Sequence, residues 1–130
     1  MENPTNPLKV LLVDDEAYFR LFVGKVLRLA VDCVIDEARD GAEAIAYCEK
    51  NSPDMVILDI NMPRMDGVQA LGKIRELRPA TPIIMLTSIS EEAIVEECVT
   101  KGASYFIRKD VRAEELQTEL QEMLKIFPQV

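Results

Sequence analysis

Short runs of apolar residues alternate along the chain with longer segments that have the periodicity of amphipathic helices. The apolar runs are rich in Val, Ile and Leu, which is typical of strands buried on both faces of a parallel sheet. The predicted strands are Leu8–Val13, Val34–Ala38, Met55–Asp59, Ile83–Thr87 and Ser104–Arg108.

In the helical segments, apolar residues recur at intervals of three and four positions and therefore share one face. The first such segment contains Phe19, Phe22, Val23, Val26, Leu27 and Ala30. The later helices are predicted to begin at Asp40 and to cover about 66–78, 91–101 and 111–127. Each predicted strand is thus followed by one predicted helix.

Two residues are predicted to mark helix ends. Asp40 is a candidate N-cap, and Glu43 three residues later completes the pattern of a capping box. Gly102 is a natural C-cap for the helix before it, in which Val95, Cys98 and Val99 are predicted to share one face.

Strict alternation of strand and helix predicts an α/β fold with a parallel sheet covered on both faces. Right-handed crossovers between five strands favour the flavodoxin-like (βα)5 arrangement, a doubly wound sheet with strand order 2-1-3-4-5. We expect one domain over residues 1–130, with an ordered core at about 8–127, an N-terminal tail at 1–7 and no effector domain.

Composition narrows the classes of function. The chain has 130 residues, 48% of them hydrophobic and 29% charged, with a formal net charge of -8. Such an acidic chain is unsuited to direct nucleic-acid binding and to anionic membrane surfaces, because both need clustered Lys and Arg. It suits a protein that binds a cation or a basic partner. The absence of histidine excludes His-based triads, His metal sites and phosphohistidine relays within the chain.

A cytoplasmic protein without membrane insertion is expected. The N-terminal segment is polar and lacks the apolar stretch of a secretory signal, and the longest apolar runs are far too short to span a membrane. Cys33, Cys48 and Cys98 form no CxxC pair and lie within apolar patterns, so reduced core thiols are predicted.

Polar residues gather where the predicted strands end. In a sheet of this type, ligands bind at the carboxyl ends of the strands, beside the switch point between the first and third strands. The residues at those ends are Asp14, Asp15, Asp59, Thr87, Ser88 and Lys109. Each has an ordinary structural explanation on its own, but their joint arrival at one edge predicts a functional site.

The chemistry of this set indicates a metal and a phosphoryl group. Carboxylates held within a few ångströms repel one another, and a bound divalent cation removes the conflict. Oxygen ligands favour Mg²⁺, with Mn²⁺ as an alternative, and the backbone carbonyl of Asn61 is a candidate further ligand. A phosphoryl group would fit between Asp59, the ion, the Thr87 hydroxyl and the Lys109 ammonium. Phosphoryl transfer requires mainly positioning and charge neutralisation, which this set supplies.

Four segments together resemble the receiver domain of two-component response regulators, particularly the small stand-alone chemotaxis type. They are LLVDDE, VILDINMPRMDG, IIMLTS and GASYFIRKD, and they occur in the order of that family over nearly the whole chain. The resemblance implies a domain that accepts a phosphoryl group from a histidine kinase, a phosphotransfer protein or a small donor such as acetyl phosphate. It also implies that the domain later loses this group by hydrolysis that it catalyses itself.

The same resemblance implies a role for each residue of the site. Asp59 would be the phosphoacceptor, and Asp14 and Asp15 would bind the metal together with it. Lys109 would pair with the phosphoryl group, and Thr87 would supply a hydroxyl that moves toward the phosphate.

A switch to a partner-binding surface is also implied. Phe106 matches the aromatic switch position on the last strand. Its inward turn would alter the surface of the fourth helix, fifth strand and fifth helix, where the family commonly binds downstream proteins. The exposed residues expected on that surface are Glu92, Glu96, Tyr105 and Gln117.

The chain departs from the family pattern after Lys109. Receivers usually have Pro at the next position, often with a cis bond, whereas this chain has Asp110. A cis bond before a non-proline residue costs roughly 2.5–4 kcal/mol, so a trans bond is predicted here. Asp110 then becomes a candidate N-cap for the last helix.

A second position is expected to set the lifetime of the phosphorylated form. Ile89 lies two residues after Thr87 and, with Asn61, flanks the route by which water would reach an acyl phosphate. A bulky apolar side chain there is expected to slow hydrolysis.

Three other classes of function fit these residues less well. Phosphatases of the haloacid-dehalogenase type resemble this pattern but carry a DxD motif at the nucleophile, whereas position 61 is Asn here. A flavin or nucleotide carrier would need a Gly-rich or hydroxyl-rich loop where this chain has Asp14, Asp15 and Glu16. The intact acidic set argues against a pseudo-receiver that only docks. An N-terminal receiver excised from a multidomain regulator stays open as an alternative.

Overall fold

The fold is a five-stranded parallel sheet covered by helices on both faces. The structure, a computed structural model, describes residues 7–62, 65–88 and 92–127. Its strands are β1 (Leu8–Val13), β2 (Cys33–Ala38), β3 (Met55–Asp59), β4 (Ile83–Thr87) and β5 (Tyr105–Arg108). They pair in parallel in the order β2-β1-β3-β4-β5. The predicted fold class and strand order are confirmed.

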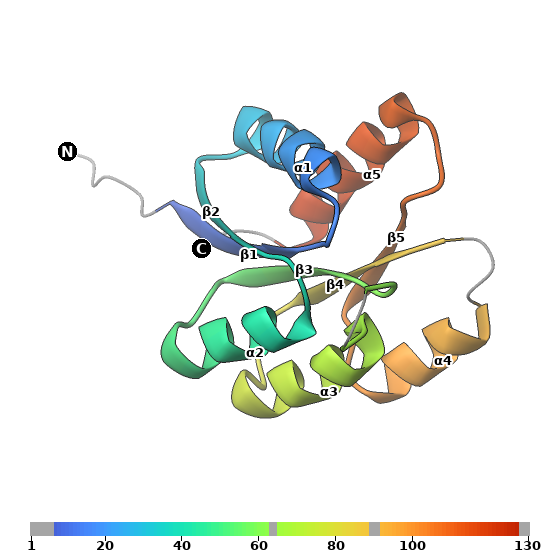
Figure 1. The fold of residues 1–130 in the computed structure, drawn as a ribbon. Coiled ribbons are helices and arrows are strands. Elements are labelled where there is room, and N and C mark those ends of the chain that lie inside the picture. The colour runs from blue at the N-terminus through green and yellow to red at the C-terminus, as the bar shows by residue number, and fades with distance from the viewer. Residues whose placement is uncertain (1–6, 63–64, 89–91, 128–130) are drawn as a thin grey trace.

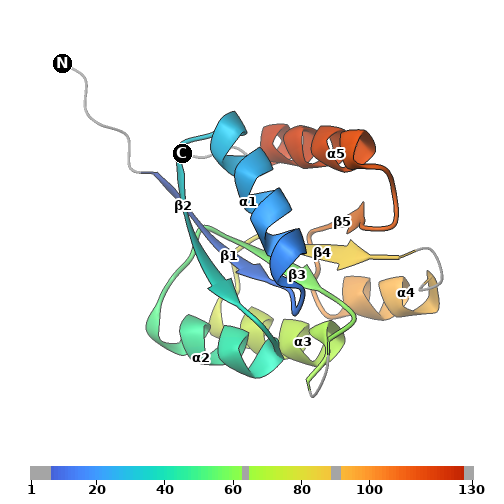
Figure 2. The ribbon, with the colours of Figure 1, turned by 45° about the horizontal axis from the view of Figure 1, so that its top comes forward.

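One helix follows each strand. The helices are α1 (Ala17–Ala30), α2 (Gly41–Lys50), α3 (Gly67–Leu77), α4 (Glu92–Thr100) and α5 (Ala113–Ile126). Helices α1 and α5 cover one face of the sheet, and α2, α3 and α4 cover the other (Figure 1). The view in Figure 2 shows the same two layers after rotation.

Alternation along the strands divides the apolar side chains between two cores. In β1, Leu8, Val10 and Leu12 face the helices α1 and α5, whereas Leu11 and Val13 face the other layer. Every residue of β3 and β4 is buried, which explains why these strands appear in the sequence as unbroken apolar runs.

Two predicted helix ends are confirmed. The Asp40 carboxylate accepts a hydrogen bond from the Glu43 N–H at 2.9 Å, which confirms Asp40 as the N-cap. The capping box is incomplete, because the Glu43 carboxylate accepts from the N–H of Arg39, one residue before the N-cap, at 2.8 Å. After α4, Gly102 has φ 103°, a conformation that glycine adopts at little cost. Its N–H and the next one donate to the carbonyls of Val99 and Cys98, as in a Schellman motif.

The prediction that Asp110 caps the last helix is wrong. The N-cap of α5 is Arg112, and Asp110 Oδ1 accepts a hydrogen bond from Arg108 Nε at 2.6 Å. The helix begins later than predicted, so Asp110 lies two residues before the N-cap and its carboxylate pairs with the nearby arginine instead.

The predicted apolar face of α4 is also narrower than expected. Cys98 is buried and Val95 is half-buried, but Val99 is 58% exposed. Helix α4 lies at the end of its layer with α3 as its helical neighbour, so it buries only a thin strip (Figure 1).

The cysteine prediction holds in part. All three cysteines are free; Cys48 and Cys98 are buried in the core, whereas Cys33 is half-buried in the outer strand β2. Among the helices of the described segments, none has both the length and the apolar character that crossing a membrane requires.

Gly67 allows α3 to begin close behind the end of β3. Its N–H donates to the Ile60 carbonyl at 2.8 Å, and a Cβ at this position would overlap the backbone carbonyl oxygen of Asp59. The absence of a side chain at position 67 therefore keeps the backbone that carries Asp59 in place.

We expect Gly67→Ala to lower the free energy of unfolding by more than about 2 kcal/mol, because backbone atoms cannot yield as a side chain would. Gly72→Ala in the same helix is the matched control, since its new Cβ would meet only the Lys101 side chain at 3.9 Å. That control should be neutral or stabilising by about 0.5–1 kcal/mol. Urea denaturation measures both, and equal stabilities would contradict the prediction.

Candidate functional site

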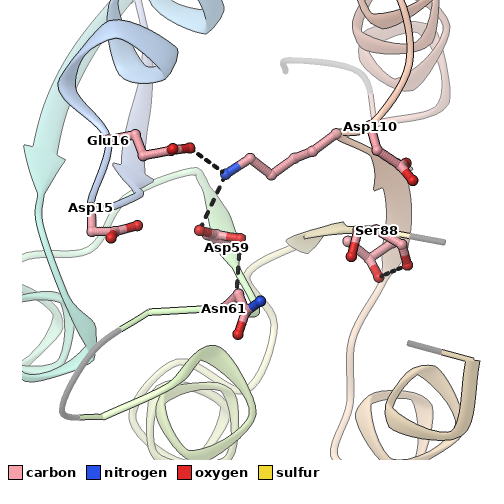
Figure 3. Close-up of a pocket in the computed structure, with 8 residues that line it drawn as sticks. Asp15, Glu16, Asp59, Asn61, Ser88 and Asp110 are labelled. Atoms are coloured by element: carbon pink, nitrogen blue, oxygen red, sulfur yellow. Dashed lines mark hydrogen bonds and ion pairs between the residues drawn. The ribbon is translucent and has the colours of Figure 1, made fainter. Parts of the chain in front are cut away.

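The predicted site residues meet at the carboxyl edge of the sheet. Asp14 follows β1, Asp59 and Thr87 are the last residues of β3 and β4, and Lys109 follows β5. Three of these residues, Asp59, Thr87 and Lys109, line a pocket of about 360 Å³ (Figure 3). The residues that line it are Asp15, Glu16, Asp59, Asn61, Thr87, Ser88, Lys109 and Asp110.

Three carboxylates form the base of this site. One oxygen from each of Asp14, Asp15 and Asp59 lies within 4.8 Å of the other two. Asp14 and Asp59 are buried, whereas Asp15 is exposed. A set made only of oxygen donors, closely spaced and open to solvent on one side, fits a hard divalent cation such as Mg²⁺.

The turn after β1 holds Asp14 in place. The Glu16 N–H donates to Asp14 Oδ1 at 2.9 Å, and Arg20 Nη1 donates to the Asp14 backbone carbonyl at 2.6 Å. Arg20 is in turn bonded through Nε to Glu37 Oε1 at 2.7 Å. The arginine thus ties the turn that carries the acidic pair to the end of β2.

Lys109 connects the carboxylates of two strand ends. Its Nζ lies 2.9 Å from Asp14 Oδ2, 3.3 Å from Asp59 Oδ2 and 3.3 Å from Glu16 Oε1. It also lies 4.4 Å from the centre of the Phe19 ring. Burial opposes its charge, but the hydrogen bond to Asp14 and the charges of Asp59 and Asp14 raise the pKa of Lys109 above its usual value. The ammonium therefore stays charged throughout the physiological range.

The surroundings of Asp59 disfavour the ionised form of its carboxylate. Burial, and then the neighbouring charge of Asp14, raise its pKa from 3.8 to about 7, despite opposing effects from Lys109 and from the Asn61 N–H. The latter donates to Asp59 Oδ1 at 3.3 Å. Burial also raises the pKa of Asp14. The Lys109 ammonium alone does not offset the charge of these carboxylates, so additional positive charge would stabilise their ionised forms.

The structure describes Thr87 and Phe106 but not Ile89. Thr87 is buried, and its hydroxyl donates to the Ser88 carbonyl at 3.3 Å. Phe106 is half-buried and packs against the core on the α2, α3 and α4 side. The described residues contain no cis peptide bond, which confirms the trans Lys109–Asp110 bond. Ile89 lies outside the described residues.

The structure adds two residues to the predicted site. Glu16, which the sequence marks only as part of an acidic run, contacts Lys109 and lines the pocket. Asp110 was assigned to the helix end, yet it also lines the pocket. In both cases the available signal was adjacency, of Glu16 to Asp15 and of Asp110 to Lys109.

Several known proteins are similar to this chain in sequence and fold. Residues 10–121 match the family model described as the response regulator receiver domain. The chemotaxis protein CheY of Listeria monocytogenes is 34% identical over 118 residues, which are 91% of this chain and 99% of that protein. A protein-glutamate methylesterase/protein-glutamine glutaminase of Archaeoglobus fulgidus is 40% identical over 91% of this chain, which corresponds to only 34% of that longer protein.

Solved structures of receiver domains have a similar fold. The response regulator domain of CheB from Thermotoga maritima superposes with a TM-score of 0.83 at 32% identity, covering 94% of this chain and 96% of that one. A CheX–CheY–BeF3–Mg²⁺ complex from Borrelia burgdorferi superposes with a TM-score of 0.82 at 32% identity, covering 95% and 91%.

The raised pKa of Asp59 gives a pH dependence with a definite sign. The folded protein holds this proton up to about pH 7, whereas the unfolded chain loses it near 3.8. The folded state therefore binds more protons between these values, and the free energy of unfolding falls as pH rises through that window. In the absence of divalent ions, Asp59→Asn should remove much of this fall and stabilise the protein at pH 8 by roughly 1–4 kcal/mol.

Urea denaturation of both proteins between pH 4 and pH 8 measures this difference. Asp32→Asn is the control, because it removes one charge from an exposed residue before β2, at the opposite edge of the sheet. The account would be contradicted if the free energy of unfolding fell equally with pH in Asp59→Asn and in the wild type.

Proposed function

This chain belongs to the response regulator receiver domain family, and from that premise we propose that it is a signalling switch that carries a phosphoryl group on Asp59. The observation that supports this most strongly is the position of that carboxylate. It ends β3, opens into the pocket, and lies between two further acidic residues and an ammonium 3.3 Å away.

The transfer needs a deprotonated Asp59 and a shielded approach for an anion. A carboxylate oxygen of Asp59 attacks the phosphorus, and the bond from phosphorus to the leaving group breaks. The leaving group departs with its bonding pair, which gives a mixed acyl phosphate. Lys109 lies within reach of the new phosphoryl oxygens and offsets their charge.

A divalent ion fits the donor set of this site. Asp14, Asp15, Asp59 and the backbone carbonyl of Asn61 would hold Mg²⁺, with Mn²⁺ as an alternative. When bound, the ion supplies positive charge that favours the ionised form of Asp59 and the phosphoryl oxygens.

The readout is proposed to run through Thr87 and Phe106. The Thr87 hydroxyl, which donates to a carbonyl of the next residue here, would donate instead to a phosphoryl oxygen. That exchange favours the state in which Phe106 turns inward, and it changes the surface formed by α4, β5 and α5. A downstream protein would bind there. The phosphoryl group would come from a histidine kinase, a phosphotransfer protein or a small phosphodonor.

Two of the four residues expected on that surface are exposed as predicted, namely Glu96 and Gln117. Tyr105 is half-buried and not exposed as predicted, because its ring packs edge-on against Phe127 with centroids 5.9 Å apart. The side chain of Glu92 lies outside the described set.

Incubation with acetyl phosphate and Mg²⁺ should add one phosphoryl group to the intact protein, seen by mass spectrometry. Asp59→Asn should abolish the addition, whereas Asp54→Asn, at an exposed residue just before β3, should leave it unchanged. The modified form should decay after the donor is removed, because an acyl phosphate hydrolyses. Phosphorylation of Asp59→Asn to the wild-type extent would refute the assignment.

Phosphorylation should also move backbone amide resonances across α4, β5 and α5, because the switch repacks Phe106. Exposed residues of α2, which lies at the other end of its layer from α4 (Figure 1), serve as an internal reference. Amide shifts confined to the pocket, with α4 and α5 unchanged, would contradict the proposed readout. Phe106→Ala should weaken the shifts in α4 and α5 without preventing phosphorylation.

A further inference from the structure

Two carboxylates line the pocket outside the three that converge on the metal position. Glu16 follows the acidic pair at the end of β1, and Asp110 follows Lys109 at the end of β5. Figure 3 shows them on opposite sides of Asp59. A phosphodonor that enters this pocket therefore comes near both residues.

Glu16 and Asp110 each lie beside one cation of the described residues. Glu16 lies 3.3 Å from Lys109 Nζ, but that ammonium is shared with Asp14 and Asp59. Asp110 has a partner of its own, Arg108, at 2.6 Å, and this arginine is not among the residues that line the pocket. A metal held by the aspartates would offset their charge, which leaves Glu16 and Asp110 as the acidic groups that a donor meets.

We propose that Glu16 and Asp110 select the phosphodonor by its charge and disfavour a free dianion. The inference rests on the proposed phosphorylation of Asp59 and adds the class of donor that the pocket admits. Repulsion between fixed charges and a donor grows in proportion to the donor's charge. A donor of lower negative charge, or one whose phosphoryl group is flanked by cationic side chains, is accordingly favoured over a free acyl phosphate.

Two small donors separate this effect from the chemistry of transfer. Acetyl phosphate is a dianion at neutral pH, and phosphoramidate is mainly a monoanion. With the first, an Asp59 oxygen bonds to phosphorus while the phosphorus–oxygen bond breaks and acetate leaves with the bonding pair. With the second, the phosphorus–nitrogen bond breaks and ammonia leaves after its nitrogen has taken a proton. The acceptor and the product are the same in both reactions.

The experiment compares rate constants for both donors in the wild type, Glu16→Gln, Asp110→Asn, Arg108→Gln and the control Asp32→Asn. The Mg²⁺ affinity of each protein is measured separately by NMR titration, and the rates are compared at saturating Mg²⁺. Low and high salt are both used, since salt screens charges that face solvent.

Glu16→Gln should raise the rate constant for acetyl phosphate by roughly three- to tenfold at low salt, with a smaller rise for phosphoramidate. Asp110→Asn should act in the same direction but less, because Arg108 already offsets part of its charge. Arg108→Gln should have the opposite sign and slow acetyl phosphate. The differences should shrink at high salt, and Asp32→Asn should resemble the wild type.

Several results would overturn the inference. One is a ratio of acetyl phosphate to phosphoramidate rates that stays at the wild-type value in Glu16→Gln and Asp110→Asn. Another is an equal acceleration of both donors that persists at high salt, which would indicate release of Lys109 rather than selection by charge. A wild-type protein that accepts a phosphoryl group from neither donor would instead overturn the proposed function, and this inference with it.

Discussion

The concentration of negative charge at the carboxyl edge of the sheet is the constraint on which the rest of the site depends. Asp14 and Asp59 are buried beside one another, and of the described residues that line the pocket only Lys109 is a cation. Its ammonium contacts both carboxylates and also Glu16. Burial and the charge of Asp14 raise the pKa of Asp59 to about 7, so a single ammonium does not offset the negative charge of these carboxylates.

The fold supplies that concentration through strand order and tight turns. Placing β1 beside β3 brings the acidic pair next to Asp59, and β5 delivers Lys109 from the edge of the sheet. Arg20 anchors the turn after β1 through the carbonyl of Asp14, and Gly67 allows α3 to close behind Asp59. The same carboxylates that create the conflict are therefore held at fixed positions, which is what phosphoryl transfer requires.

Much of this was predictable from sequence, for a specific reason. Unbroken apolar runs end abruptly in Asp14, Asp59 and Thr87, so strand ends and site residues are marked by the same change of polarity. Contacts that depend on competition between partners were not predictable. Asp110 bonds to Arg108 instead of capping α5, and Tyr105 is partly covered by Phe127, a residue distant in the sequence. Val99 is exposed because few elements surround α4. The spacing of apolar residues along a helix does not predict how many neighbouring elements will cover it.

Binding of beryllofluoride, which mimics a phosphoryl group, tests the central claim most directly. Fluorine NMR of the wild type with beryllofluoride and Mg²⁺ should show bound resonances that disappear when Mg²⁺ is removed, and Asp59→Asn should show none. That result would establish a metal-dependent phosphoryl site centred on Asp59. Bound resonances of equal intensity in Asp59→Asn, or none in the wild type at saturating Mg²⁺, would contradict the account.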